Sequence, residues 1–175
     1  MPDYVRAYVL GGSYFFTVAL LERRRRLLTE NIEALREAFG SVRARRPFRI
    51  DATVILPDHL HCLWTLPPND LDFSTRWRLI KSSFARTIAP GERLSTRRQT
   101  KHERGVWQRR FWEHAIQDQR DYDTHLDYIY FNPVKHGWVA RVPDWPHSSF
   151  HRFVRLGLYP LGWAAPAATR EWDLE

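Results

Sequence analysis

Hydrophobic and polar positions along the chain predict four short strands. Residues 13–20, SYFFTVAL, follow a Gly-Gly turn signal and are rich in β-branched and aromatic side chains, which is typical of a strand. Residues 48–56 and 59–66 also alternate well enough to form strands, and only a Pro-Asp turn separates them. So short a connection predicts an antiparallel hairpin. Aromatic and apolar character returns at residues 111–116, which predict the fourth strand.

Three other segments carry apolar residues at helical spacing. In residues 27–44, 72–88 and 118–132 the apolar side chains recur at intervals of three and four, which predicts three amphipathic helices. Pro133 disfavours helical geometry at the residue before it, so we expect the third helix to end at Asn132.

The order of these elements indicates the fold class. Strand, helix, strand, strand, helix, strand is the ferredoxin-like order, so we expect an α+β protein whose antiparallel sheet is flanked by helices, with a further helix and a tail added. Residues 90–105 have almost no apolar side chains and predict a mobile loop. No internal repeat is evident, and we expect residues 1–175 to form one domain with a core over about residues 4–142 and a Trp- and Pro-rich tail over about residues 143–175.

Composition excludes several classes of protein. The 175 residues are 43% hydrophobic and 14% aromatic, which is enough to bury a core and excludes wholesale disorder. No apolar run approaches the roughly 20 residues of a membrane span, and residues 1–8, MPDYVRAY, lack the pattern of a signal peptide. The one cysteine, Cys62, can form neither an internal disulfide nor a Cys-rich zinc site. We therefore expect a cytoplasmic protein with no membrane partner.

The charge is basic overall and unevenly distributed. The chain holds 27 Lys and Arg against 20 Asp and Glu, a formal net charge of +7 with a pI near 10.0. Residues 23–49 contain nine Arg against three Glu, or +6, and residues 76–110 contain eleven Lys and Arg against two Glu, or +9, which leaves −8 on the rest. A genome rich in G and C explains a preference for Arg over Lys but not this clustering. Two basic stretches on an otherwise acidic chain favour a face that binds a polyanion.

A His-Leu-His triplet lies within the third predicted strand. Because side chains alternate faces along a strand, His59 and His61 project together and can share one cation, whereas Cys62 projects from the opposite face. In the alternative interpretation His59 belongs to the turn and His61 is an ordinary, partly buried histidine. The triplet alone leaves both interpretations open.

A second chemical signal lies at the end of the third predicted helix, in DYIYFNP. Tyr128 and Asn132 are four residues apart and so share one helix face. Tyrosine can act as a covalent nucleophile, although its ordinary pKa of about 10 calls for a neighbouring cation or base. Taken alone, Tyr128 and Tyr130 are better explained as core or surface aromatics.

Five segments occur in this order along the chain: LPDHLHCLWTLP, FSTRWRLIK, WQRRFWEHAI, DYIYFNPVKHGWV and DWPHSSFHR. Together they resemble the REP-associated tyrosine transposases, which are relatives of the IS200/IS605-type transposases in the HUH endonuclease superfamily. The resemblance covers about residues 4–163. It implies the HUH nuclease fold. It also implies a single-tyrosine DNA endonuclease and strand transferase that acts on single-stranded DNA at the hairpins of repetitive extragenic palindromes (REPs).

The resemblance implies a role for each residue that matches its motifs. His59 and His61 match the two histidines that bind a divalent cation, and Asn132 matches the third metal ligand, for which related transposases use a Gln. Tyr128 matches the nucleophile, whose attack on the scissile phosphate leaves a 5′-phosphotyrosyl enzyme and a free 3′-hydroxyl. The family implies Mg²⁺ or Mn²⁺, whereas imidazole ligands by themselves favour Mn²⁺ or Zn²⁺.

Basic side chains near these motifs are the candidate DNA contacts. We expect backbone contacts from Arg76, Arg78, Lys81, Arg86, Arg109, Arg110 and Lys135. His114 and His125 are candidates for proton handling, although structural roles explain them better. Trp77 and Trp107 are candidates to stack on unpaired bases, but the periodicity of their neighbours favours the core.

Three functions account for these features. The first is a metal-dependent DNA strand transferase, and the second is a hairpin-binding protein adopted by its host that no longer cuts. The complete set of histidines, tyrosine and asparagine speaks against loss of catalysis. The third is a zinc hydrolase that combines the His-Leu-His triplet with His114, Asp58 or Glu113. The REP-associated branch is expected to act as a monomer on hairpin DNA of the nucleoid, whereas insertion-sequence relatives often dimerise.

Overall fold

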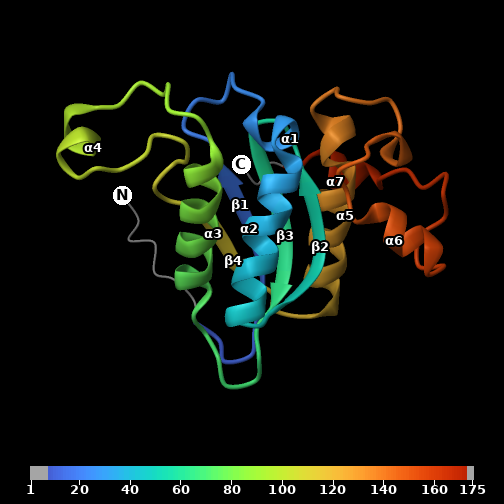
Figure 1. The fold of residues 1–175 in the computed structure, drawn as a ribbon. Helices are drawn as coiled ribbons and strands as arrows, with labels where there is room; N and C mark the ends of the chain where they lie inside the picture. Colours follow the sequence, from blue (N-terminus) through green and yellow to red (C-terminus); the bar gives the residue numbers. More distant parts are fainter. Residues whose placement is uncertain (1–7, 173–175) are drawn as a thin grey trace.

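Four strands form an antiparallel sheet in the computed structural model, which describes residues 8–172 (Figure 1). In sheet order they are β2 (Arg49–Ile55), β3 (His59–Thr65), β1 (Ser13–Ala19) and β4 (Trp112–Ala115). β3 and β1 are central, because β3 pairs with β2 and β1, and β1 also pairs with β4. The ferredoxin-like sheet is thereby confirmed. Both ends of the predicted domain, residues 1–7 and 173–175, lie outside the described residues.

Helices α2 (Ile32–Arg45) and α3 (Phe73–Thr87) cover one face of the sheet, and the short helix α1 (Leu27–Glu30) precedes α2 (Figure 1). The sequence predicted one continuous helix over residues 27–44, but the structure divides it at Asn31. The Asn31 side chain donates a 2.9 Å hydrogen bond to the backbone carbonyl of Leu27. The backbone at Asn31 departs from helical geometry, with a φ of −120° and a ψ of 39°, and this separates α1 from α2.

Helix α5 (Gln119–Lys135) covers the other face of the sheet. The Asp118 carboxylate caps its first turn by accepting a 2.8 Å hydrogen bond from a backbone N–H. The prediction that this helix ends at Asn132 is wrong, because α5 continues through Pro133 and is followed by Gly137 with a φ of 70°. A proline costs a helix one hydrogen bond, but Pro133 is buried, so tertiary packing compensates for the loss.

The segment predicted as a mobile loop, residues 90–105, contains the short helix α4 (Thr96–Thr100) and is tied to the end of α3. Arg104 donates hydrogen bonds to the backbone carbonyls of Ala85 (2.7 Å) and Ile88 (3.0 Å). Carbonyls at a helix end lack partners within the helix, so these bonds satisfy them. The hydrophobic pattern did not reveal this attachment because an arginine, and no apolar side chain, makes it.

The carboxyl-terminal tail packs beside α5 and along the outer edge of β2 (Figure 1). It contains η1 (Val142–Asp144), α6 (Phe150–Arg155) and α7 (Ala167–Arg170). The backbone N–H of Ser149 donates a 2.9 Å hydrogen bond to the carbonyl of Thr53 in β2. A covered edge strand cannot pair with another chain, so the tail protects this side of the sheet.

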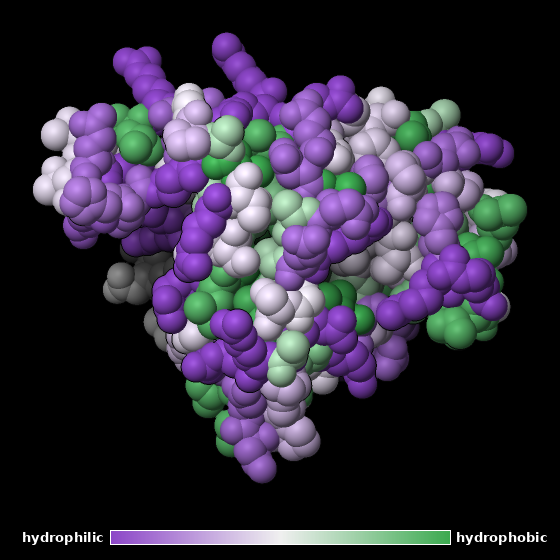
Figure 2. Space-filling view, viewed as in Figure 1, coloured by the Kyte–Doolittle hydropathy of each residue, from purple (hydrophilic) through white to green (hydrophobic). Residues whose placement is uncertain are grey.

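Each face of the sheet has its own apolar core. Trp64 stacks on Trp77 beneath α2 and α3, with 4.3 Å between ring centroids and an interplanar angle of 16°. Phe15, Leu63 and Ile129 belong to the core beneath α5. Hydrophilic side chains project over the outside of α2 and α3, where apolar patches are small and separate (Figure 2). In the part of the chain that the structure describes, no helix combines the length and apolar character needed to cross a membrane.

Candidate active site

The two histidines of β3 lie on the face of the sheet that α5 covers. Their ring centroids are 5.0 Å apart, and both side chains are buried. Cys62 lies in the opposite core, beneath α2 and α3. The interpretation that His59 belongs to the turn does not hold, because His59 is the first residue of β3 and the strand is regular through His61.

Polar neighbours hold both imidazoles at Nδ1. His59 Nδ1 lies 2.8 Å from the Asp58 carboxylate and 3.2 Å from the Arg23 guanidinium, which also donates a 2.7 Å hydrogen bond to Asp58. Burial acts to raise the pKa of Asp58, but the bonds from His59 and Arg23 outweigh it and lower this pKa from 3.8 to about 2. His61 Nδ1 lies 2.9 Å from the Thr17 hydroxyl. With both Nδ1 atoms engaged, Nε2 is the nitrogen through which each ring would coordinate a cation.

Helix α5 brings a second row of side chains to the histidines. Tyr128, Asn132 and His136 are spaced by four residues and share one helix face. The ring centroid of Tyr128 lies 5.3 Å from that of His61, and the ring centroid of His136 lies 5.0 Å from that of His59. Asn132, midway between them along the helix, therefore lies opposite the two imidazoles.

The amide of Asn132 fits a metal ligand. Its side chain is fully buried, and neither Oδ1 nor Nδ2 has a hydrogen-bond partner within residues 8–172. A buried polar group without a partner costs about 1–3 kcal/mol. The amide oxygen is a hard donor of the kind that Mg²⁺ and Mn²⁺ accept. Two imidazoles and this oxygen form a donor set that suits a divalent cation.

Lys135, which we expected at the DNA backbone, lies against the tyrosine. Its Nζ donates a 3.1 Å hydrogen bond to the Tyr128 hydroxyl and lies 5.1 Å from the ring centroid. An ammonium group at this distance stabilises negative charge on the phenol oxygen. This pair was not predicted from the sequence, although a spacing of seven residues is about two helical turns and places both on one face.

Tyr130 lies away from this site. Its ring packs against Phe150 and Tyr159, and its hydroxyl lies 3.2 Å from that of Ser149. Burial raises the pKa of Tyr130 well above its ordinary value. Two residues along a helix rotate a side chain by about 200°, so only Tyr128 of this pair meets the histidines.

His114, Asp121 and His125 form a second polar cluster, in which the possible ligand atoms lie within 4.8 Å of one another. The Asp121 carboxylate lies 2.8 Å from His114 Nε2 and 3.0 Å from His125 Nδ1. Burial lowers the pKa of His125. The Phe15 ring packs against both His125 and Tyr128. The cluster is a hydrogen-bonded unit beside the tyrosine, and proton handling by its histidines stays a prediction.

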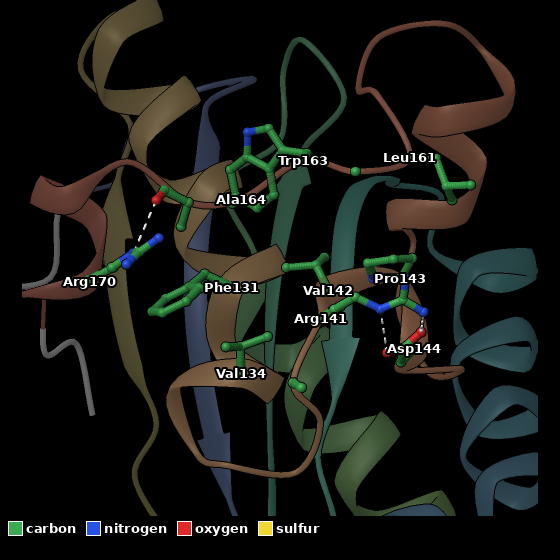
Figure 3. A pocket seen from close by; sticks show the side chains of 13 residues that line it. Phe131, Val134, Arg141, Val142, Pro143, Asp144, Leu161, Trp163, Ala164 and Arg170 are labelled. Carbon is green, nitrogen blue, oxygen red and sulfur yellow. Dashed lines mark hydrogen bonds and ion pairs between the residues drawn. The ribbon is translucent and has the colours of Figure 1, made fainter.

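A cavity of about 720 Å³ lies between α5 and the tail (Figure 3). Phe131, Val142 and Trp163 contribute apolar lining, and Arg141 at its rim is paired with Asp144 at 2.7 Å. None of the predicted site residues lines this cavity. It therefore lies apart from the predicted site.

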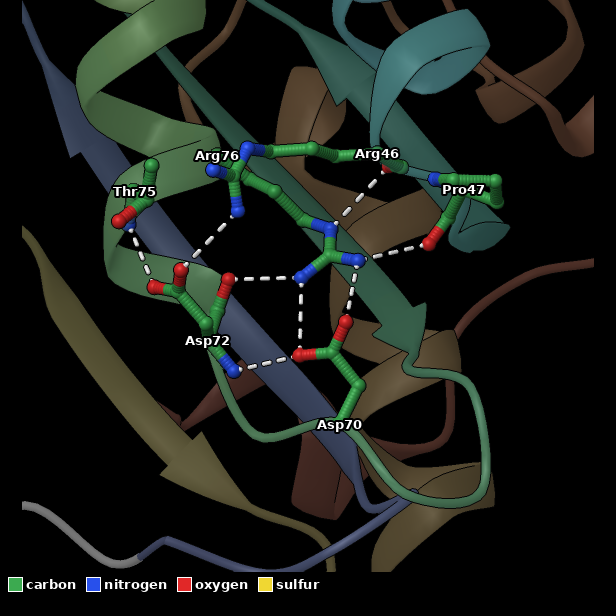
Figure 4. Close-up of polar contacts among 6 residues, drawn as sticks. All are labelled: Arg46, Pro47, Asp70, Asp72, Thr75 and Arg76. Carbon is green, nitrogen blue, oxygen red and sulfur yellow. Dashed lines mark hydrogen bonds and ion pairs between the residues drawn. The ribbon is translucent and has the colours of Figure 1, made fainter.

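Arg76 corrects one prediction, because it is not placed to contact DNA. Its side chain is 2% exposed. Each hydrogen bond that the structure describes for its guanidinium goes to another group of the protein (Figure 4). Two go to the Asp70 carboxylate (2.6 and 3.1 Å), and the others go to the backbone carbonyls of Arg46 (3.2 Å), Pro47 (2.8 Å) and Asp72 (2.8 Å). The bond from Arg76 also lowers the pKa of Asp70. Arg76 therefore joins the start of α3 to the end of α2.

Apart from Lys135, the other predicted DNA contacts lie in or next to one hollow beside α3. Three exposed arginines line this hollow of about 690 Å³: Arg78, Arg86 and Arg109. Arg110, next in the chain, is also exposed. Lys81 lines the same hollow, but its Nζ donates a 2.6 Å hydrogen bond to the carbonyl of Gln108, and burial, with a neighbouring arginine, lowers the pKa of Lys81 to about 8. Exposed arginines around a concave surface suit an anionic backbone.

Trp77 and Trp107 belong to the core, as the periodicity of their neighbours favoured. Their exposed fractions are 0% and 5%. The Trp107 indole N–H donates a 3.0 Å hydrogen bond to the carbonyl of Lys81. Neither ring presents a face on which a base can stack.

The three residues that were candidates to complete a zinc-hydrolase site do not join His59 and His61 at the predicted metal position. Glu113 pairs with Phe16, which lies in the core beneath α2 and α3, so its side chain projects from the opposite face of the sheet. Asp58 bonds Nδ1 of His59, the nitrogen away from the predicted metal position. His114 is bonded to Asp121.

Comparison with known proteins identifies the family. The family model for "Transposase IS200 like" matches residues 11–132. The REP-associated tyrosine transposase of Escherichia coli (strain K12) is 53% identical over 164 residues, which cover 94% of this chain and 92% of the relative. The solved structure of a REP-associated tyrosine transposase bound to a REP hairpin is 51% identical, with a TM-score of 0.82 over 95% of this chain and 93% of that chain. The chain therefore belongs to the IS200-like transposases, a metal-dependent family of HUH-type nucleases, in the branch of the REP-associated tyrosine transposases.

Proposed function

We propose that this protein cuts and rejoins single-stranded DNA beside a hairpin through a covalent bond between Tyr128 and the DNA. The observation that carries the proposal is the Tyr128 hydroxyl, which lies 3.1 Å from Lys135 Nζ on the helix face that meets His59 and His61. The choice of substrate is supported by the solved relative, which is bound to a REP hairpin.

In the proposed reaction the phenol oxygen of Tyr128 attacks the scissile phosphorus and the bond from phosphorus to the 3′ oxygen breaks. The phenol gives up one proton and the leaving 3′ oxygen takes up one, so protons balance. The products are a 5′-phosphotyrosyl protein and a free 3′-hydroxyl. The Lys135 ammonium group stabilises the negative charge on the phenol oxygen. Attack by a 3′-hydroxyl on the phosphotyrosine then rejoins DNA without ATP, because the phosphodiester energy is kept. Tyr128 is fully buried, so strand entry has to move the side chains packed over it.

His59, His61 and Asn132 would hold the divalent cation of the family. Mg²⁺ or Mn²⁺ is proposed ahead of Zn²⁺ because the amide oxygen is a hard donor. When bound, the cation supplies positive charge to a non-bridging oxygen of the scissile phosphate. The contribution of the chain is orientation, since Asp58 and Thr17 hold the two imidazoles at Nδ1.

The hollow beside α3 is the proposed contact to the DNA backbone. Arg78, Arg86 and Arg109 line it, and Arg110 adjoins it. Arginine forms bidentate bonds to phosphate, and each contact of this kind makes binding more sensitive to salt. Lys81 is a weaker candidate, since its ammonium group is already bonded to the carbonyl of Gln108.

The proposed setting follows from the substrate. We propose that the protein acts on hairpins of chromosomal DNA in the cytoplasm, at the nucleoid. We propose that residues 1–175 act as one unit and as a monomer, because β3 and α5 of the same chain supply the histidines and the tyrosine. A hairpin-binding protein that no longer cuts is not favoured, because the residues required for cutting are present and come together.

Covalent capture tests the proposed function. Wild-type protein with Mn²⁺ and a hairpin oligonucleotide that carries a single-stranded flank should form a protein–DNA adduct that survives denaturing electrophoresis. Tyr128→Phe, and wild-type protein in EDTA, should form none. Tyr130→Phe is the matched control and should retain the adduct. An adduct in Tyr128→Phe would overturn the assignment, and hairpin binding with no adduct in wild type would favour the non-cutting alternative.

A further inference from the structure

Trp112 lies exposed on the same face of the sheet as His61. In β4 it pairs with Thr17 of β1, and Thr17 pairs with His61 of β3, so the three side chains form one row across the sheet. Neighbouring strands are about 4.8 Å apart, which places the backbone of Trp112 about 10 Å from that of His61. The side chain of Trp112 is 36% exposed, whereas Trp77 in the core is 0% exposed.

Aromatic and polar neighbours hold the Trp112 ring. It lies parallel to His114, with 6.0 Å between centroids and an angle of 8°, and His114 stacks on His125 at 4.6 Å and 15°. The Phe15 and Trp112 rings meet in a T-shaped arrangement, with 5.7 Å between centroids and an interplanar angle of 70°. Asp121 bonds both imidazoles, which fixes them behind the indole. A preorganised aromatic surface loses little conformational entropy when a ligand stacks on it.

We infer that Trp112 is the stacking surface for an unpaired nucleobase of the single strand next to the scissile phosphate. The inference rests on the proposed function, because it takes the phosphate to lie at His61. A strand that crosses the sheet from His61 towards β4 passes over Trp112. Arg110, exposed two residues earlier, offers a cation for the adjoining backbone.

The chemistry of the indole selects an unpaired base. Bases of a hairpin stem are stacked on one another, whereas a base in a single strand offers its π-face to an aromatic side chain. Trp112 therefore acts on the flank of the hairpin and not on its stem. Its stacking position adds a contact to single-stranded DNA that the basic hollow beside α3 does not supply.

Binding of two oligonucleotides tests the inference, one a hairpin with a single-stranded flank and the other the same hairpin without it. All proteins carry Tyr128→Phe, so that binding is measured without cleavage, and the adduct assay judges the proposed function separately. Trp112→Ala should weaken binding of the flanked hairpin about five- to hundredfold, the loss expected for one stacked base. It should leave the unflanked hairpin unchanged, and Trp112→Phe should retain most of the affinity.

Abasic substitutions in the flank make the test specific to one base. With Trp112 intact, one abasic position should weaken binding by a similar factor, and Trp112→Ala should remove the effect of that position. Trp138→Ala is the matched control, since Trp138 is 41% exposed and packs on Trp145, which is bonded to Ile55 at the opposite edge of the sheet. The inference is overturned if Trp112→Ala weakens both hairpins equally or neither. It is also overturned if no abasic position affects binding while Trp112 is intact, a result that does not depend on how the variant folds.

Discussion

The two faces of the sheet bury different kinds of side chain, and β3 contributes residues to both. Cys62 and Trp64 lie in the core beneath α2 and α3, whereas His59 and His61 lie beneath α5. Aromatic rings fill the first face, where Trp64 stacks on Trp77. The second face buries imidazole, phenol and amide groups together.

This difference separates stability from chemistry within one strand. Apolar burial stabilises a fold by about 25 cal/mol per Å², whereas a buried polar group destabilises it unless a partner is provided. Both faces bury apolar side chains that stabilise the fold, and the face beneath α5 also carries groups such as Asn132 that would lower stability without a ligand.

The largest expected effect is on the apolar face. Trp77→Ala should lower the free energy of unfolding by about 3–5 kcal/mol, because it removes a buried ring and leaves a cavity. Denaturant unfolding followed by circular dichroism measures this loss. His61→Ala is the comparison on the other face and should abolish the covalent adduct with a much smaller loss of stability. Equal losses from the two substitutions would contradict the division between the faces.

A second comparison is between two arginines of α3, because Arg76 is buried and Arg78 is exposed. Arg76→Met should lower the free energy of unfolding by about 1–3 kcal/mol, since it leaves Asp70 and several carbonyls without their donor. It should leave the salt dependence of hairpin binding unchanged. Arg78→Gln should change stability by less than about 0.5 kcal/mol and reduce the slope of log K against log salt by about 1. A reduced slope in Arg76→Met would show that Arg76 does contact the DNA backbone.

The carboxylate beside His59 predicts a loss of stability in acid. The pKa of Asp58 is lowered in the folded protein from 3.8 to about 2, so its stabilising contribution is present above pH 4 and is lost as the pH falls through about 2. A shift of this size corresponds to about 2 kcal/mol. Unfolding free energies at pH 5 and pH 2 should therefore differ less in Asp58→Asn than in wild type. Equal differences would show that Asp58 does not hold His59 in the way described.

The smallest expected effect is an increase in the free energy of unfolding, whereas the preceding substitutions lower it or reduce its dependence on pH. Asn132→Leu should raise the free energy of unfolding by about 1 kcal/mol in EDTA, because it replaces a buried amide that has no hydrogen-bond partner among residues 8–172 with an apolar side chain of similar size. The same substitution should abolish metal-dependent adduct formation. Thermal unfolding in EDTA, beside the adduct assay with Mn²⁺, measures both. A clear loss of stability in EDTA would mean that the amide has a structural role of its own.

Much of the fold and of the candidate site could be predicted because it depends on neighbours in the chain. Alternation along a strand placed His59 and His61 on one face, and helical spacing placed Tyr128 beside Asn132. The four strands and their order along the chain also followed from local pattern. The helix ends did not, since non-helical backbone at Asn31 divides one helix and burial of Pro133 extends another.

Only the tertiary structure decided which of two residues of the same type is buried and which is exposed to solvent. Arg76 and Arg78 stand two residues apart in one helix, yet the first is enclosed by Asp70 and backbone carbonyls and the second is exposed. Trp107 is buried, whereas Trp112 is exposed in the row of His61. The sequence by itself determined the periodicity that brings the histidines together and the tyrosine to its asparagine, because strand and helix geometry are local. Burial depends on elements distant along the chain, and therefore only the packed structure shows which cations and rings can meet DNA.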